Sequence, residues 1–203
     1  MITATAAVTK LREGNARFVS EHCEHSAHIG KMRRSSLLES QEPFAIILGC
    51  SDSRVPSEII FDQGLGDLFV VRVAGNIVAP SQLGSIEFAV SHFDTPLVVV
   101  LGHTCCSAIV ATLNEIQSPA QPPQSPHIDS ILGRIRPALE PLCYRQPRLG
   151  SEALLQEAIR ANVNATVDQL PRNSSLLQDR IEEGKLLIVG AQYHLDSGEV
   201  EFF

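Results

Sequence analysis

Residues 44–54 read FAIILGCSDSR, an unbroken apolar run that leads into a loop with a thiol, a carboxylate and a guanidinium. A second stretch of this kind, LVVVLGHTCC at residues 97–106, ends in an imidazole and two thiols. Apolar runs without polar alternation are typical of strands that are buried on both faces of a parallel sheet. The two stretches therefore predict neighbouring core strands whose carboxyl ends carry reactive side chains.

Two more apolar runs predict further strands, LFVVRV at residues 68–73 and LLIV at residues 186–189. The tail, residues 198–203, follows an Asp-Ser-Gly turn and predicts an antiparallel edge strand. Helical patterns separate these runs, at residues 8–18, 81–93 with Ser81 as the cap, 107–113 and 151–170. The alternation predicts an α/β fold, with a mainly parallel central sheet of four to five strands flanked by helices.

The remaining segments bear on domain organisation. Residues 118–126 (SPAQPPQSP) hold four prolines in nine residues, which predicts a connector that is not helical. It does not divide the chain, because the strand at residues 186–189 needs a sheet to join, and residues 1–203 are expected to form one domain. The short amphipathic helix at residues 8–18 would be marginal in isolation, so we expect it to pack on a neighbouring subunit.

Composition excludes several classes of protein. The 203 residues include 23 acidic and 16 basic ones, a net charge of −7, which argues against nucleic-acid binding. No run of about 18 apolar residues is present, so no membrane helix is expected. The first seven residues lack the basic start of a secretory signal, and a cytoplasmic location is expected. Thiols stay reduced there, so the five cysteines need an explanation other than disulfides.

The strand ends bring together residue types that bind metals. Cys50 follows the first run and His103 follows the third, so both belong at the same edge of a parallel sheet. Thiolate and imidazole are natural zinc ligands, and two cysteines with one histidine leave a fourth position for water or substrate. Cys106 is the expected third ligand, because two residues separate it from His103, whereas Cys105 would point about 100° away around a helix. Two alternatives remain open, a cysteine that is simply buried and a cysteine-nucleophile hydrolase.

Asp52 and Arg54 follow Cys50 closely and can pair, since a guanidinium can hold a carboxylate with two hydrogen bonds. One interpretation is an ion pair that only stabilises the loop. The other places an ionised Asp52 beside the metal, where it accepts a hydrogen bond from a zinc-bound hydroxide or binds the zinc itself.

These segments together closely resemble the β-class carbonic anhydrases. The match includes CSDSRV at residues 50–55, GHT-x-C at 102–106, GDLFVVR at 66–72 and GSIEFAV at 84–90. The resemblance implies reversible hydration of carbon dioxide to bicarbonate, with one zinc ion per subunit. It also implies a homodimer or homotetramer. The residues that it assigns are the ligands Cys50, His103 and Cys106 and the catalytic dyad Asp52 and Arg54.

The resemblance also implies a substrate pocket that contains Gln41 and Phe69, with Gln41 possibly supplied by the neighbouring subunit. Phe88 stands where the plant-like subgroup has a tyrosine, so one pocket hydroxyl is missing. Ser107 stands where the family often has glycine, and its backbone N–H would still face the substrate. His92 falls where some members have a histidine proposed to relay protons.

One subgroup of the family has a second, inhibitory bicarbonate site. Arg72 and Tyr193 align with two residues of that site, but Ile47 replaces its tryptophan, so no such site is expected here.

Charge balance predicts how the activity depends on pH. Two thiolates and a neutral imidazole cancel the charge of zinc, which makes it a weaker Lewis acid than zinc held by three histidines. Activity should therefore climb towards alkaline pH. Two other functions compete with carbon dioxide hydration, a carbon disulfide or carbonyl sulfide hydrolase on the same motif and a non-catalytic regulator that responds to zinc or bicarbonate.

Overall fold

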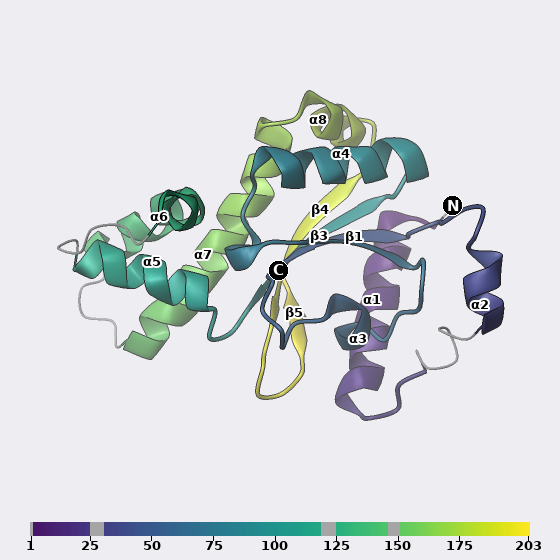
Figure 1. Ribbon diagram of the computed structural model, residues 1–203, viewed down its shortest axis with the longest axis horizontal. Coiled ribbons are helices and arrows are strands. Elements are labelled where there is room, and N and C mark those ends of the chain that lie inside the picture. The colour runs from purple at the N-terminus through teal and green to yellow at the C-terminus, as the bar shows by residue number, and fades with distance from the viewer. Residues whose placement is uncertain (1, 25–30, 119–124, 146–150) are drawn as a thin grey trace.

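A five-stranded sheet runs through the centre of the computed structural model, which describes residues 2–24, 31–118, 125–145 and 151–203 (Figure 1). The strand order is β2-β1-β3-β4-β5; the first four strands are parallel and β5 is antiparallel to β4. The predicted α/β class and the mainly parallel sheet are therefore confirmed. The strands are β1 (Ala45–Gly49), β2 (Leu68–Arg72), β3 (Leu97–His103), β4 (Leu187–Tyr193) and β5 (Val200–Phe202).

Helices cover both faces of the sheet. In Figure 1, α1 and α3 lie on one side, α4 and α8 lie on the other, and α5 and α6 flank one end together with α7. The helices are α1 (Ala4–Val19), α2 (Lys31–Ser36), α3 (Ser57–Ile60), α4 (Pro80–Phe93), α5 (Ser107–Gln117), α6 (Pro126–Arg145), α7 (Ser151–Arg172) and α8 (Ser175–Glu182), with a short 3₁₀ helix η2 (Ala74–Asn76). Among the described residues, no helix is both long and apolar enough to span a bilayer.

The central strands are buried on both faces, as their continuous apolar sequence predicts. Ile47 and Val99 pack in the cluster beneath α1 and α3, whereas Ile46 and Val100 pack on the opposite face beneath α4, α7 and α8. Successive strand residues point to opposite faces, so each strand contributes to two hydrophobic layers. A third cluster lies among α5, α6 and α7 at the carboxyl end of the sheet, and it includes Cys50 and Cys106.

The register of the sheet aligns the ends of β1 and β3. Gly49, the last residue of β1, lies opposite Arg72 in β2 and Leu101 in β3. β3 continues to His103, and Cys50 follows β1 directly. The residues that were expected to meet at one edge of the sheet are therefore placed there by strand pairing.

Helix α1 packs on its own chain, and its expected packing on a neighbouring subunit stays a prediction. Its Leu11 is fully buried in the same cluster as Val99 of the sheet. Asn15 Nδ2 donates to the carbonyls of Ile60 (3.2 Å) and Gly198 (2.9 Å), and Asn15 Oδ1 accepts from the Val200 N–H (2.9 Å). The chain's own sheet, α3 and β4–β5 turn therefore supply the packing surface that a helix of this length needs.

The short helices α2, α3 and α8 were not predicted, and α4 and α6 differ from the prediction for reasons that involve proline. Helix α4 begins at Pro80 without a side-chain cap, and Ser81 lies within its first turn, where its hydroxyl donates to Gln82 Oε1 (3.1 Å). The predicted Ser81 cap was wrong because proline, with φ already fixed and no N–H to satisfy, takes the first helical position. The 20-residue α6, with two internal prolines, was not predicted; it begins at Pro126, the last residue of the predicted non-helical connector, of which residues 119–124 lie outside the described part.

Candidate metal centre and active site

Three side chains converge at the carboxyl edge of the sheet. Cys50 comes from the end of β1, His103 from the end of β3 and Cys106 from the residue that precedes α5. One potential ligand atom of each lies within 4.8 Å of the others, and all three residues are buried. This is the set that the sequence predicted, and the separation of the atoms suits a single cation between them.

The His103 ring is oriented so that one nitrogen is left for a metal. Its Nδ1 lies 2.8 Å from the carbonyl oxygen of Thr104, and since a carbonyl only accepts, Nδ1 carries the proton. Nε2 is therefore unprotonated in the neutral ring. It is fully buried and has no hydrogen-bond partner among the described residues. A buried acceptor without a partner is costly, and a bound cation would satisfy it.

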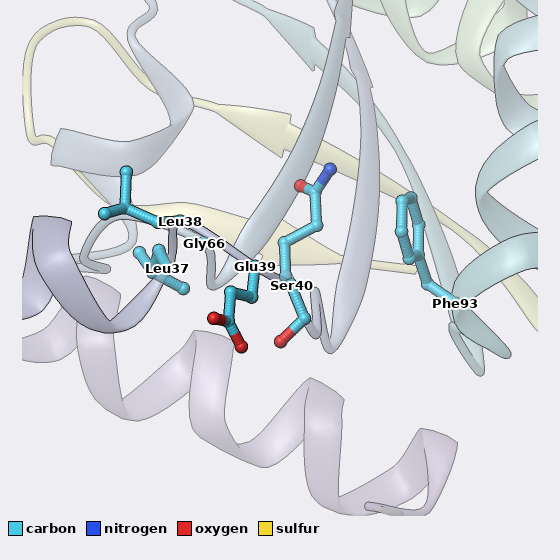
Figure 2. Close-up of a pocket in the computed structure, with 7 residues that line it drawn as sticks. Leu37, Leu38, Glu39, Ser40, Gly66 and Phe93 are labelled. Atoms are coloured by element: carbon cyan, nitrogen blue, oxygen red, sulfur yellow. The ribbon is translucent and has the colours of Figure 1, made fainter.

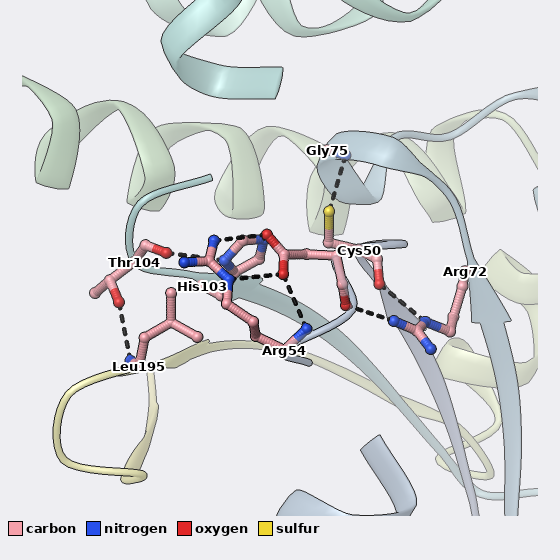
Figure 3. Close-up of polar contacts among 8 residues, drawn as sticks. Cys50, Arg54, Arg72, Gly75, His103, Thr104 and Leu195 are labelled. Carbon is pink, nitrogen blue, oxygen red and sulfur yellow. Dashed lines mark hydrogen bonds and ion pairs between the residues drawn. The ribbon is translucent and has the colours of Figure 1, made fainter. Parts of the chain in front are cut away.

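Backbone N–H groups support the two sulfur atoms. Gly75 in η2 donates its N–H to Cys50 Sγ (3.4 Å), as Figure 3 shows. Gly75 has φ 69°, and a Cβ there would lie 2.7 Å from Ile135 Cδ1, so the position requires glycine. Backbone N–H groups at the start of α5 act to lower the pKa of Cys106, although the neighbouring Cys50 and burial raise it by more.

Without a cation, the pKa values of the Cys50 and Cys106 thiols shift in opposite directions. Hydrogen bonding from Cys106, with a further contribution from the Gly75 N–H, lowers the pKa of Cys50 to about 4 against the effect of burial. The resulting Cys50 thiolate and burial raise the pKa of Cys106. The pKa of Cys50 is therefore lowered and that of Cys106 is raised. A divalent cation would allow both to ionise, so the donor set fits zinc.

Asp52 and Arg54 form a forked ion pair beside this cluster. Arg54 donates from Nε to Asp52 Oδ1 (2.9 Å) and from Nη2 to Oδ2 (2.7 Å), and its backbone N–H donates to Oδ1 (3.0 Å). These bonds hold the pKa of Asp52 well below its usual range, chiefly through the Arg54 side chain. Asp52 Oδ2 also lies 4.0 Å from His103 Nε2. The loop therefore directs an ionised carboxylate at the atom that is left for the metal.

A second arginine holds the backbone of the same loop. Arg72, at the end of β2, donates from Nε to the carbonyl of Cys50 (3.0 Å) and from Nη2 to the carbonyl of Asp52 (2.6 Å), as Figure 3 shows. The sequence indicated Arg72 through the GDLFVVR match and through its alignment with a second bicarbonate site, and neither predicts this contact. Its contact with the loop depends on the pairing of Gly49 with Arg72, which no local sequence signal reveals.

Cys105 is kept out of the cluster by its backbone. Its φ is 57° and its side chain is exposed, so it lies in a turn before α5. The choice of Cys106 over Cys105 agrees with the observed grouping. The reason given for it was wrong, since Cys105 is not part of the helix.

Ser107 is the first residue of α5, directly beside Cys106, but the other expected pocket residues lie elsewhere in the chain. Phe69 pairs with Ile46, three residues before Gly49 and so about 10 Å along the strand. His92 lies about 18 Å along α4 from Pro80, near the amino end of the sheet.

Aromatic contacts join these distant residues to one another. The ring centroids of Phe88 and His92 are 3.9 Å apart, and Phe93 lies 5.9 Å from Phe88 and 6.1 Å from Phe69. A hollow of about 490 Å³ next to Phe93 is lined by Gln41. Figure 2 shows this hollow with its other lining residues, Leu37, Leu38, Glu39, Ser40 and Gly66. Within one chain, Gln41, Phe69, Phe88 and His92 therefore form a group that is separate from the metal cluster.

Comparison with known proteins identifies the class. Residues 45–200 match the family model described as carbonic anhydrase. A carbonic anhydrase of Mycolicibacterium smegmatis is 43% identical over 196 residues, which cover 97% of this chain and 91% of the relative. Carbonic anhydrase 2 of Mycobacterium tuberculosis is 42% identical over 193 residues, covering 95% and 89%. The chain therefore belongs to the carbonic anhydrase family.

Solved structures narrow this to the β class. The β-carbonic anhydrase CcaA superposes with a TM-score of 0.76 at 25% identity, covering 97% of this chain and 94% of that one. A tetrameric β-carbonic anhydrase of Sordaria macrospora gives a TM-score of 0.74 at 25% identity, covering 88% and 89%. The protein is a carbonic anhydrase enzyme of the β class, as its motifs had indicated.

Proposed function

We propose that this carbonic anhydrase binds one zinc ion per subunit through Cys50, His103 and Cys106, and hydrates carbon dioxide with the help of Asp52 and Arg54. The single observation that carries the proposal is the position of the Asp52 carboxylate, 4.0 Å from the unpartnered Nε2 of His103. Zinc, when bound, would supply the Lewis acidity that lets water ionise, and so become a nucleophile, at a much lower pH than free water.

Asp52 orients the nucleophile. An ionised carboxylate only accepts hydrogen bonds, so Asp52 accepts one from the water that reacts and fixes the direction of its lone pair. Arg54 holds both oxygens of Asp52, which keeps the carboxylate ionised and restricts its rotation. If Arg54 releases Asp52, the carboxylate is near enough to the cluster to occupy the fourth coordination position and close the site.

The proton that hydration releases leaves from the exposed side of the dyad. The Arg54 side chain is 53% exposed, so water and buffer reach this side of the site directly. His92 lies at the far end of α4 in the same chain. A relay by His92 therefore stays a prediction, and it requires the histidine of a neighbouring subunit.

A second copy of the chain completes the substrate pocket. Gln41, Phe69 and Phe88 lie away from the chain's own cluster, and Phe88 is 48% exposed, which suits residues that serve a neighbouring site. Large apolar side chains near the β2 edge of the sheet are exposed as well, among them Leu38, Ile59 and Leu65. An apolar surface of this kind favours a homodimer or a homotetramer. All five cysteines are free, which suits a reducing, cytoplasmic location.

The test is stopped-flow hydration of carbon dioxide, with the zinc content measured on the same sample, from about pH 6.5 to about pH 9. We expect about one zinc per chain and a hydration rate that is lost when the metal is removed and returns with zinc. Zinc-loaded protein that hydrates carbon dioxide no faster than buffer, yet releases sulfide from carbonyl sulfide, would replace the proposal with the sulfur-substrate hydrolase.

A further inference from the structure

Arg72 contacts the metal-site loop at two points that both matter to the chemistry. Its Nε donates to the carbonyl of Cys50 and its Nη2 donates to the carbonyl of Asp52, at 3.0 Å and 2.6 Å (Figure 3). One carbonyl belongs to a sulfur ligand and the other to the carboxylate of the dyad. A single guanidinium thus bridges the two residues whose relative position the proposed mechanism requires.

The bridge connects the loop to a rigid element. Arg72 is the last residue of β2 and is paired in register with Gly49, the residue before Cys50. The loop itself has few other backbone anchors among the described residues: the Val55 N–H donates to the Asp52 carbonyl (3.0 Å) and closes a turn. That turn is internal to the loop, whereas Arg72 ties the loop to the edge of the sheet.

The chemistry of the bridge is specific to arginine. The planar guanidinium presents donors in a fixed fork, so it can bond two carbonyls at once, whereas the ammonium of lysine is a compact point charge on a flexible stem. Arg72 is exposed, so its contribution to folding stability is expected to be small compared with its effect on local geometry.

We propose that Arg72 is a positioning residue that holds the loop from Cys50 to Arg54 in the open arrangement, in which both oxygens of Asp52 are bonded to Arg54 and the carboxylate is not itself a metal ligand. This inference rests on the proposed function of the site. Without the bridge, the peptide between Cys50 and Asp52 can rotate, and the carboxylate can move the short distance to the fourth coordination position. Arg72 acts through the loop and touches neither substrate nor metal.

The test compares Arg72→Lys and Arg72→Ala with Arg134→Lys. Arg134 is a matched control, because it also donates to a backbone carbonyl, but to that of Val78 (3.1 Å), which lies outside the loop from Cys50 to Arg54. Zinc content, thermal stability, kcat and KM are measured, and the absorption spectrum of the cobalt-substituted protein reports the fourth ligand without any turnover.

We expect both Arg72 variants to keep about one metal per chain and a melting temperature close to that of the wild type. Their kcat should fall roughly 10- to 100-fold, as displaced catalytic groups do, with a smaller change in KM. The cobalt spectrum should be that of a carboxylate-bound ion over a wider pH range than in the wild type. Millimolar guanidinium should partly restore the kcat of Arg72→Ala. Arg134→Lys should match the wild type.

Two results would overturn the inference. In the first, the Arg72 variants show the wild-type cobalt spectrum, pH profile and kcat. In the second, they lose metal and melt early, and guanidinium restores nothing, which would assign Arg72 a structural role only. A wild-type protein that binds zinc but does not hydrate carbon dioxide would refute the proposed function, whereas the cobalt spectra would still test Arg72.

Discussion

Asp52 Oδ2 lies 4.0 Å from His103 Nε2, although the two residues are 51 positions apart in the chain. The carboxylate is held there by Arg54, and the imidazole is held by the Thr104 carbonyl. An anion that only accepts hydrogen bonds thus faces a nitrogen lone pair, an arrangement that is unfavourable until something positive, or a proton donor, comes between them. The predictions below depend on this relationship.

Cys106→Ser should abolish zinc binding, because a hydroxyl at this position does not supply the thiolate that the cluster requires. The variant should also melt at a lower temperature, since a metal that binds only the folded chain adds to the free energy of unfolding. Cys105→Ser is the matched control, because the Cys105 thiol is next to Cys106 in sequence but exposed, and zinc binding should not need it. Metal analysis decides, and full zinc in Cys106→Ser would refute the ligand assignment.

Asp52→Asn should keep its zinc and lose most of its hydration rate, roughly 100-fold or more, as when a preorganised polar group is removed from an active site. The amide is neutral and can donate, so it no longer orients the nucleophile. Asp168→Asn, which disturbs an exposed ion pair with Arg172, serves as the control. Stopped-flow rates that are equal in Asp52→Asn and in the wild type would remove Asp52 from the mechanism.

Arg54→Ala should favour the closed form, in which Asp52 binds the cation. Loss of Arg54 lets the pKa of Asp52 rise towards its ordinary value of about 4, which still leaves it ionised at pH 7. The variant therefore loses activity because the Asp52 carboxylate is no longer held in position, and raising the pH should not restore that activity. A cobalt spectrum identical to that of the wild type at every pH would contradict this prediction.

The pH dependence of the wild-type rate should show a rise towards alkaline pH and no acid limb from Asp52. Two thiolates offset the charge of the cation, so the reacting water loses its proton at higher pH than beside zinc held by three histidines. Arg54 depresses the pKa of Asp52, so this group stabilises the fold above its unfolded pKa of about 4, and that stability is lost only as the pH falls further. Hydration rates and thermal melts across pH check the two statements separately.

Asn15→Ala should reduce the free energy of unfolding by about 2–3 kcal/mol, because it leaves buried carbonyls and an N–H without their partner. Zinc content should not change, since Asn15 lies on α1, on the face of the sheet opposite to α4. Urea denaturation measures the effect. A loss below about 0.5 kcal/mol would show that α1 does not dock on its own chain as described.

The sequence was sufficient to predict the strands and the grouping of Cys50, His103 and Cys106. Continuous apolar runs identify β1 and β3, and parallel pairing then forces Cys50 and His103 to the same edge. Helix α6 was missed because Pro137 and Pro141 argue locally against a helix, whereas the burial of Ile135 and Leu139 stabilises it through tertiary packing.

The position of α1 and the role of Arg72 could not be predicted, for a related physical reason. Both depend on which surfaces meet after the sheet has formed. Asn15 reaches Gly198 across 183 positions of sequence, and Arg72 reaches the loop only through the register of β1 and β2. The pocket residues were predicted by resemblance, and a single chain leaves Gln41 and Phe69 away from the cluster.

Gly75 lies between Cys50 and side chains of helices α5 and α6. Its N–H reaches the Cys50 sulfur only while the peptide sits in a space bounded by Ile135 of α6 and Ala108 of α5. Asn162 of α7 fixes the carbonyl of the same residue at 2.9 Å. The hydrogen bond to this sulfur thus depends on how α5, α6 and α7 pack against η2, so a bulkier side chain in that apolar layer is expected to weaken it without changing any residue of the site.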